Sequence, residues 1–116
     1  MEHIANSGHT VHGVDVNKAV VNNVLAGTAG SDEPDLADLL KTALVSGRIT
    51  ASTSPSAADI FIIAVPTPIN DDRTPNLAYV TSACRSIVRH LKIGDLVIIE
   101  STIPPSATTT DIATAL

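Results

Sequence analysis

Cysteine, aromatic residues and positive charge are all scarce in this chain, and each shortage excludes something. The single cysteine, Cys84, cannot form an internal disulfide, which fits a reducing, cytoplasmic compartment. Aromatic residues make up 2% of the 116 residues, so the core must be built from Val, Ile, Leu and Ala. The net charge is −5 and no basic cluster occurs, which argues against nucleic acid as a partner. No apolar run approaches the ~20 residues of a membrane span, so we expect no membrane partner.

Histidine spacing also excludes a class of site. The four histidines form no set with cysteine or carboxylates at the spacing of metal ligands, so we predict no metal site. They are His3, His9, His12 and His90.

The most informative stretch that is present is ADIFIIAVPTP, residues 58–68. Its unbroken apolar run, residues 60–65, predicts a strand covered on both faces, as in a parallel sheet flanked by helices. Pro66 and Pro68 lack the N–H that a strand ladder needs, so the chain must leave the sheet as a loop. Ligands bind just beyond the carboxyl ends of such strands. Thr67, the one hydroxyl residue between these prolines, is therefore a candidate binding residue.

Helical and strand periodicities alternate along the chain, which predicts an α/β fold with a doubly wound parallel sheet. The length suits one small domain. Asp32 or Asp35 is expected to cap the helix that carries the apolar stripe Leu36 to Leu44, with Pro34 in its first turn. We expect strands at residues 10–14, 49–52, 60–65 and 96–99, and helices at residues 1–7, 17–25, 34–46, 76–92 and from 107 onward.

Asp15 ends the first expected strand, within the sequence GVDVN. A carboxylate there can accept both hydroxyls of an adenosine ribose, as in NAD-binding Rossmann folds. The alternative is a helix cap, since aspartate is common before a helix. The glycine-rich phosphate loop should lie ~20 residues before that aspartate. Counting back runs off the start of the chain, so we expect the first strand and its loop to be missing or to lie upstream of Met1.

Thr102 follows the second apolar strand much as Thr67 follows the first. Both hydroxyls are candidates for contacts with a dinucleotide or a reacting group. The alternative for each is local turn chemistry, because hydroxyls readily bond nearby backbone.

Five segments together resemble the NAD-binding domain of the UDP-glucose/GDP-mannose dehydrogenase family, in that family's order and spacing. Within the family the likeness is greatest to members that oxidise UDP-N-acetylmannosamine. The segments are GHTVHGVDVN (8–17), EPDLADLLKTAL (33–44), ADIFIIAVPTP (58–68), PNLAYV (75–80) and GDLVIIESTIPP (94–105).

The resemblance implies an NAD-dependent oxidoreductase that oxidises a UDP-sugar to its uronate, supplying precursors of surface polysaccharides. Asp15 is then the ligand of the adenosine ribose, Thr67 an NAD contact, and Thr102 a cofactor contact with a supporting catalytic role. The family's nucleophilic cysteine and its lysine have no counterpart in this chain, and Cys84 lies outside the family's cysteine motif. We therefore expect a partial domain, residues 1–116, that is inactive alone.

A missing first strand has a physical consequence, because that strand is central in the usual strand order. Unpaired strand edges predict a chain that is marginally stable or that self-associates through its unpaired strands. The competing functions are a non-catalytic Rossmann-like remnant or interaction module that binds no dinucleotide, and a β-hydroxyacid dehydrogenase remnant. The EPDL and EST segments argue against the last.

Overall fold

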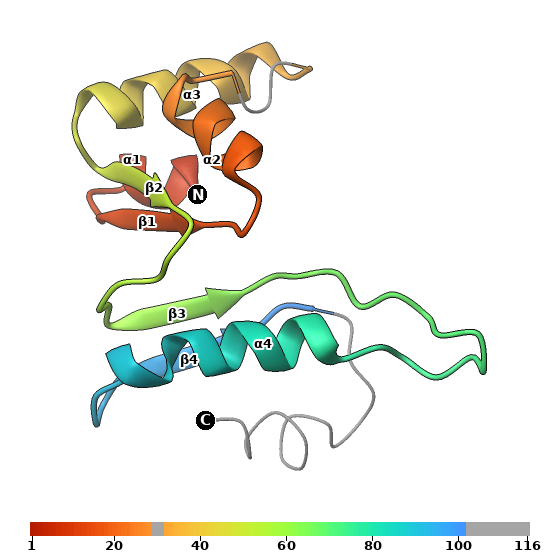
Figure 1. Cartoon of the computed structure of the whole chain (residues 1–116). Coiled ribbons are helices and arrows are strands. Elements are labelled where there is room, and N and C mark those ends of the chain that lie inside the picture. Colours follow the sequence, from red (N-terminus) through yellow and green to blue (C-terminus); the bar gives the residue numbers. More distant parts are fainter. Residues whose placement is uncertain (29–31, 102–116) are drawn as a thin grey trace. The chain divides into compact units, whose positions relative to one another are not determined.

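The chain forms two compact units, Met1–Pro55 and Ser56–Leu116, and each contains its own pair of parallel strands (Figure 1). The computed structural model describes residues 1–28 and 32–101. Along these residues the helices and strands follow the predicted order. The helix expected from residue 107 lies outside the described residues.

In the described part of the first unit, α2 and α3 pack against a two-stranded parallel sheet and α1 packs against α3. Strands β1 and β2 pair with Val11 opposite Ile49 and Val14 opposite Ser52. Ala5, Leu40, Ala43 and Ile49 form the buried core, so helix and strand residues far apart in sequence share one apolar cluster. The elements are α1 (Glu2–Asn6), β1 (Val11–Val14), α2 (Lys18–Leu25), α3 (Pro34–Val45) and β2 (Ile49–Ser52).

The ends of the helices in this unit show which local predictions hold. Gly27, with φ 73°, follows α2 as expected of a glycine that ends a helix. Pro34 occupies the first turn of α3, as predicted. The expectation that Asp32 or Asp35 caps α3 is wrong. Glu33 stands at the N-cap in an extended conformation and makes no side-chain cap hydrogen bond.

The described residues of the second unit form β3 (Ile60–Ile63), α4 (Ala78–Ile87), a 3-10 turn (Val88–His90) and β4 (Leu96–Ile99). The strands are parallel, with Ile60 opposite Leu96 and Ile63 opposite Ile99. One face of this sheet packs against α4, which runs beside both strands in Figure 1. The buried cluster there is Phe61, Ile63, Val80, Cys84 and Ile87.

The opposite face of the same sheet is apolar but exposed, contrary to the expectation that β3 is covered on both faces. Ile60 is 55% exposed and Ile62 47%, whereas Ile63 is 5% exposed. Their neighbours on β4, Leu96 and Ile98, are exposed as well. The alternation arises because, among the described residues, α4 covers the side of the sheet that carries Phe61 and Ile63.

Candidate functional site

Asp15 directly follows β1, and local hydrogen bonds hold it there. Its N–H donates to the carbonyl of Ser52 over 3.3 Å, which extends the pairing of β1 with β2 by one residue. Its Oδ1 accepts the N–H of Asn17 at 2.8 Å. Asn17 in turn caps α2, since its Oδ1 accepts the N–H of Ala19 at 2.9 Å. The helix cap is therefore Asn17, and Asp15 fixes the turn before it.

The second carboxylate oxygen of Asp15, Oδ2, has no hydrogen-bond partner among the described residues. It lies on a half-buried side chain at the carboxyl end of a parallel strand, the position predicted from the sequence. One oxygen thus stabilises the turn and the other remains available to an incoming hydroxyl group.

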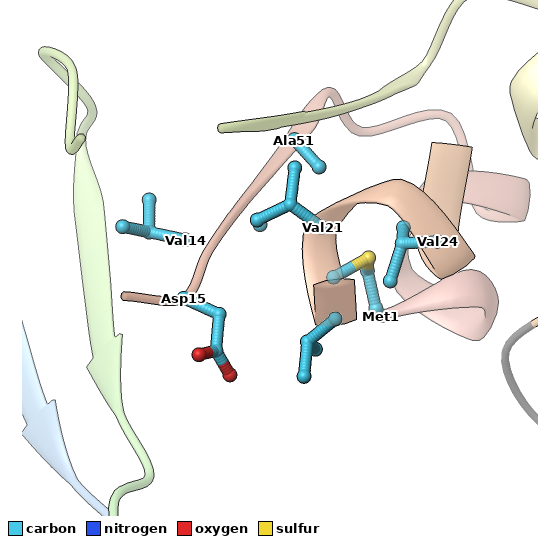
Figure 2. A pocket seen from close by; sticks show the side chains of 8 residues that line it. Met1, Val14, Asp15, Val21, Val24 and Ala51 are labelled. Carbon is cyan, nitrogen blue, oxygen red and sulfur yellow. The ribbon is translucent and has the colours of Figure 1, made fainter. Parts of the chain in front are cut away.

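A small apolar hollow lies beside Asp15 in the first unit (Figure 2). Its volume is about 120 Å³, below the roughly 300–1,000 Å³ of sites that enclose a whole drug-sized ligand. The hollow therefore suits part of a ligand resting against aliphatic side chains beside a carboxylate. Its lining is Met1, Gly13, Val14, Asp15, Val20, Val21, Val24 and Ala51.

Thr67 lies in the loop after β3, within the second unit, and its side chain is half-buried. Its hydroxyl has no hydrogen-bond partner in the described part of the chain, so the structure provides no local turn bond for it there. Hydrogen bonds to β4 and to Ser101 hold the start of this loop. Glu100 donates its N–H to the carbonyl of Ile63 at 2.9 Å, and Ser101 then contacts Val65. Thr102, the third predicted site residue, lies outside the described residues.

Beyond Thr67 the chain forms a tight hairpin, in which Ile69 and Pro75 make an antiparallel bridge. Asp72 accepts hydrogen bonds from the hydroxyl and the N–H of Thr74. These bonds, the hydroxyl bond first, lower the pKa of Asp72 below its ordinary 3.8. Arg73 has a φ of 66°, a left-handed conformation that a turn requires and that side chains other than glycine seldom adopt. The charged tip is thus an ordered turn on the surface.

A polar cluster crosses the two strands of the first unit, and no sequence motif indicated it. His12 Nδ1 lies 2.7 Å from Thr50 Oγ1, and His12 Nε2 lies 3.0 Å from Ser52 Oγ. Ser52 donates its own proton to the carbonyl of Ser54 at 2.6 Å. The serine oxygen must then accept from His12, which assigns the ring proton to Nε2. The cluster links β1 to β2 through side chains.

Three further findings concern the cysteine, metal ligands and membrane-spanning helices. Cys84 is fully buried on α4, and burial raises the pKa of its thiol, which is the behaviour of a structural rather than a nucleophilic cysteine. Within residues 1–28 and 32–101, no group of three His, Cys, Asp or Glu side chains is placed to hold a metal ion. No helix in this part of the chain is long and apolar enough to cross a membrane.

Comparison with known proteins gives the context of these positions. A curated UDP-N-acetyl-D-mannosamine dehydrogenase from Escherichia coli K12 is 49% identical over 98 residues, which are 84% of this chain and 23% of that protein. An NDP-N-acetyl-D-galactosaminuronic acid dehydrogenase from Ralstonia nicotianae is 44% identical over 105 residues, 90% of this chain and 25% of that protein. The chain therefore spans about a quarter of the length of these relatives.

Solved structures show the same likeness. The native structure of UDP-N-acetyl-mannosamine dehydrogenase from Staphylococcus aureus superposes with a TM-score of 0.91 at 38% identity, covering 97% of this chain and 28% of that one. A ternary complex of GDP-mannose dehydrogenase from Pseudomonas aeruginosa gives a TM-score of 0.88 at 25% identity, covering 98% of this chain and 28% of that one. These matches confirm the predicted fold class, a partial Rossmann-like α/β domain.

The family model described as "UDP-glucose/GDP-mannose dehydrogenase family, NAD binding domain" matches residues 1–116. The predicted resemblance is thereby confirmed, and with it NAD as the cofactor of the family. The chain belongs to the UDP-glucose/GDP-mannose dehydrogenase family, within its NAD binding domain.

Proposed function

We propose that residues 1–116 are one part of the NAD-binding domain of a UDP-sugar dehydrogenase, with UDP-N-acetylmannosamine as the sugar substrate. The 49% identity to a UDP-N-acetyl-D-mannosamine dehydrogenase supports this substrate over others of the family. The product is the corresponding uronate, a precursor for surface polysaccharide. The chain alone is inactive in this proposal, because the family's cysteine nucleophile has no counterpart in it.

The observation that carries the proposal is that Asp15 Oδ2, at the carboxyl end of β1, has no hydrogen-bond partner within residues 1–28 and 32–101. A carboxylate oxygen accepts hydrogen bonds, and a ribose offers two adjacent hydroxyl donors. The aliphatic hollow beside Asp15 offers apolar surface to the adenosine. In this proposal Asp15 binds the adenosine ribose. The Thr67 hydroxyl donates or accepts a hydrogen bond with the dinucleotide, and Thr102 contacts the cofactor near the reacting sugar. When bound, NAD⁺ supplies the hydride acceptor for the oxidation.

The test is a titration of the purified chain with NAD⁺, followed by two-dimensional amide NMR. We expect shifts in amides next to Asp15 and Thr67. Asp15→Asn keeps the oxygen that accepts the Asn17 N–H but removes the charge, so it should weaken NAD⁺ binding about tenfold while the spectrum stays folded. Asp59→Asn, an exposed aspartate before β3, is the matched control. Unshifted amides in the folded wild-type chain would contradict the proposal and favour the competing function, a module that binds no dinucleotide.

Activity is tested separately. Incubation of the chain with NAD⁺ and UDP-N-acetylmannosamine should produce no NADH absorbance at 340 nm. Turnover above a protein-free control would show that the chain is catalytically complete, against the proposal.

The unpaired strand edges support one further element of the proposal, self-association. Each described sheet has only two strands, and the exposed face of the second carries Ile60 and Ile62. Parallel sheets are normally covered on both faces, and an unpaired strand edge can pair with another chain. Sedimentation velocity should show a concentration-dependent dimer that Ile62→Lys weakens. Ile69→Lys, a change at an exposed isoleucine of the hairpin, is the control.

A further inference from the structure

Ser101 makes an unusual pair of hydrogen bonds at the end of β4. Its hydroxyl oxygen accepts the N–H of Val65 at 2.9 Å, and its proton is donated to the carbonyl of the same residue at 2.8 Å. The preceding rung of the ladder is main-chain, from the Glu100 N–H to the Ile63 carbonyl. In a regular parallel ladder the Val65 N–H would go to a carbonyl of the facing strand. A side chain has taken that place.

This substitution fixes the start of the loop without continuing the strand. Val65 precedes Pro66, which has no N–H to contribute to a ladder. Both backbone polar groups of Val65 are nevertheless satisfied, although the residue is half-buried against the core of the second unit. Without Ser101 the N–H would need another acceptor and the carbonyl another donor, or water for both, at a site partly closed to solvent. The Ser101 hydroxyl therefore holds the backbone of Val65, two residues before Thr67.

We propose that Ser101 is a positioning residue for nucleotide binding: it holds the Val65 backbone so that Thr67 is presented in one conformation to the dinucleotide. The inference rests on the proposed function, since it assigns Ser101 to the same cofactor site. A preorganised loop costs less entropy to order when a ligand binds. Only a hydroxyl side chain supplies both a donor and an acceptor in so small a volume, so threonine can replace serine and alanine cannot.

The experiment compares Ser101→Ala and Ser101→Thr with Ser86→Ala as the matched control. Ser86 also donates its hydroxyl proton to a backbone carbonyl, that of Ala83, but it does so on the exposed side of α4. Hydrogen exchange by NMR measures the Val65 amide, and an NAD⁺ titration measures affinity. We expect Ser101→Ala to accelerate exchange at Val65 and weaken NAD⁺ binding, each about tenfold, the factor that corresponds to about 1.4 kcal/mol. Exchange at the core residue Val80 should stay unchanged.

The variants separate positioning from simple loss of stability. Ser101→Thr should restore both values to within about twofold of wild type, and Ser86→Ala should alter neither. If wild type binds NAD⁺ and Ser101→Ala binds it equally well, the positioning role is wrong while the proposed function stands. If Ser101→Ala accelerates amide exchange equally at Val65 and Val80, Ser101 stabilises the whole unit without positioning the loop, and the inference is overturned. A wild-type chain that is folded but does not bind NAD⁺ overturns the proposed function and the positioning role together.

Discussion

Two neighbouring isoleucines on β3 provide the sharpest test of the packing described above. Ile62 and Ile63 are adjacent, share a strand and have the same side chain, but Ile63 is 5% exposed and Ile62 is 47% exposed. Ile63 packs in the cluster with Phe61 and Val80 beneath α4. Changing each to alanine removes the same atoms and the same β-branched strand preference, so the difference between the two variants measures burial alone.

The size of that difference follows from the exposures. An isoleucine-to-alanine change in a core costs about 2–5 kcal/mol, because a cavity adds to the lost transfer free energy. Ile62 is already half in water, so its change loses only about half of the ~2.4 kcal/mol carried by three methylene equivalents and opens no cavity. We therefore expect Ile63→Ala to lower the free energy of unfolding by about 1–4 kcal/mol more than Ile62→Ala.

Urea denaturation followed by far-UV circular dichroism measures this directly. With a slope of about 1–3 kcal/mol per molar urea, the two midpoints should differ by roughly 1 M. Dilute protein is needed so that self-association does not protect Ile62. Equal midpoint shifts in dilute solution would refute the single-face packing and would mean that something in the chain also covers Ile62.

Three other predictions concern local hydrogen bonds. Because the pKa of Asp72 is lowered in the folded hairpin, ionised Asp72 stabilises the turn above pH 3.8 and this stabilisation is lost as the pH falls through the lower folded pKa. Thr74→Val should raise that pKa in a carboxyl NMR titration, and an unchanged value would contradict the assignment. Asn17→Ala removes the α2 cap and should cost about 1 kcal/mol, with faster amide exchange confined to the start of α2. His12→Ala breaks the side-chain link between β1 and β2 and should cost about 0.5–1.5 kcal/mol by urea denaturation, whereas a surface change at His9 should cost little.

Hydrophobic periodicity predicted an element well where the segment buries one apolar face. The helix expected at residues 76–92 is realised as α4 and a 3-10 turn, because apolar spacing marks which side of a helix is buried. The helix starts at Ala78 instead of Asn76: Leu77 is the N-cap and makes no side-chain cap hydrogen bond, and Asn76 accepts the N–H of Ala78 from the preceding turn. The residue at which a helix starts depends on backbone angles, which composition does not record. The same reason explains why Asp32 or Asp35 was the wrong cap for α3.

The apolar run of β3 shows a second limit of the sequence. Continuous hydrophobicity predicted a strand with two buried faces, and the strand is present, but Ile60 and Ile62 are exposed. The pattern records which side chains are suited to burial, whereas burial itself requires a partner surface. The strand is also shorter than the apolar run, because the N–H of Val65 donates to the Ser101 hydroxyl and not to a main-chain carbonyl of β4. That bond joins residues 36 positions apart, and no local pattern contains it.

Asp15 shows why the site was easier to locate than to interpret. Strand periodicity placed it correctly after β1, and two roles, cap or ribose ligand, then competed for it. The structure assigns the cap to Asn17 and uses a single oxygen of Asp15, Oδ1, to hold the turn. A carboxylate has two oxygens, so a structural bond through one leaves the other available for a ligand. The two roles are therefore compatible, and the turn bond favours binding, because it fixes the carboxylate before a ribose arrives.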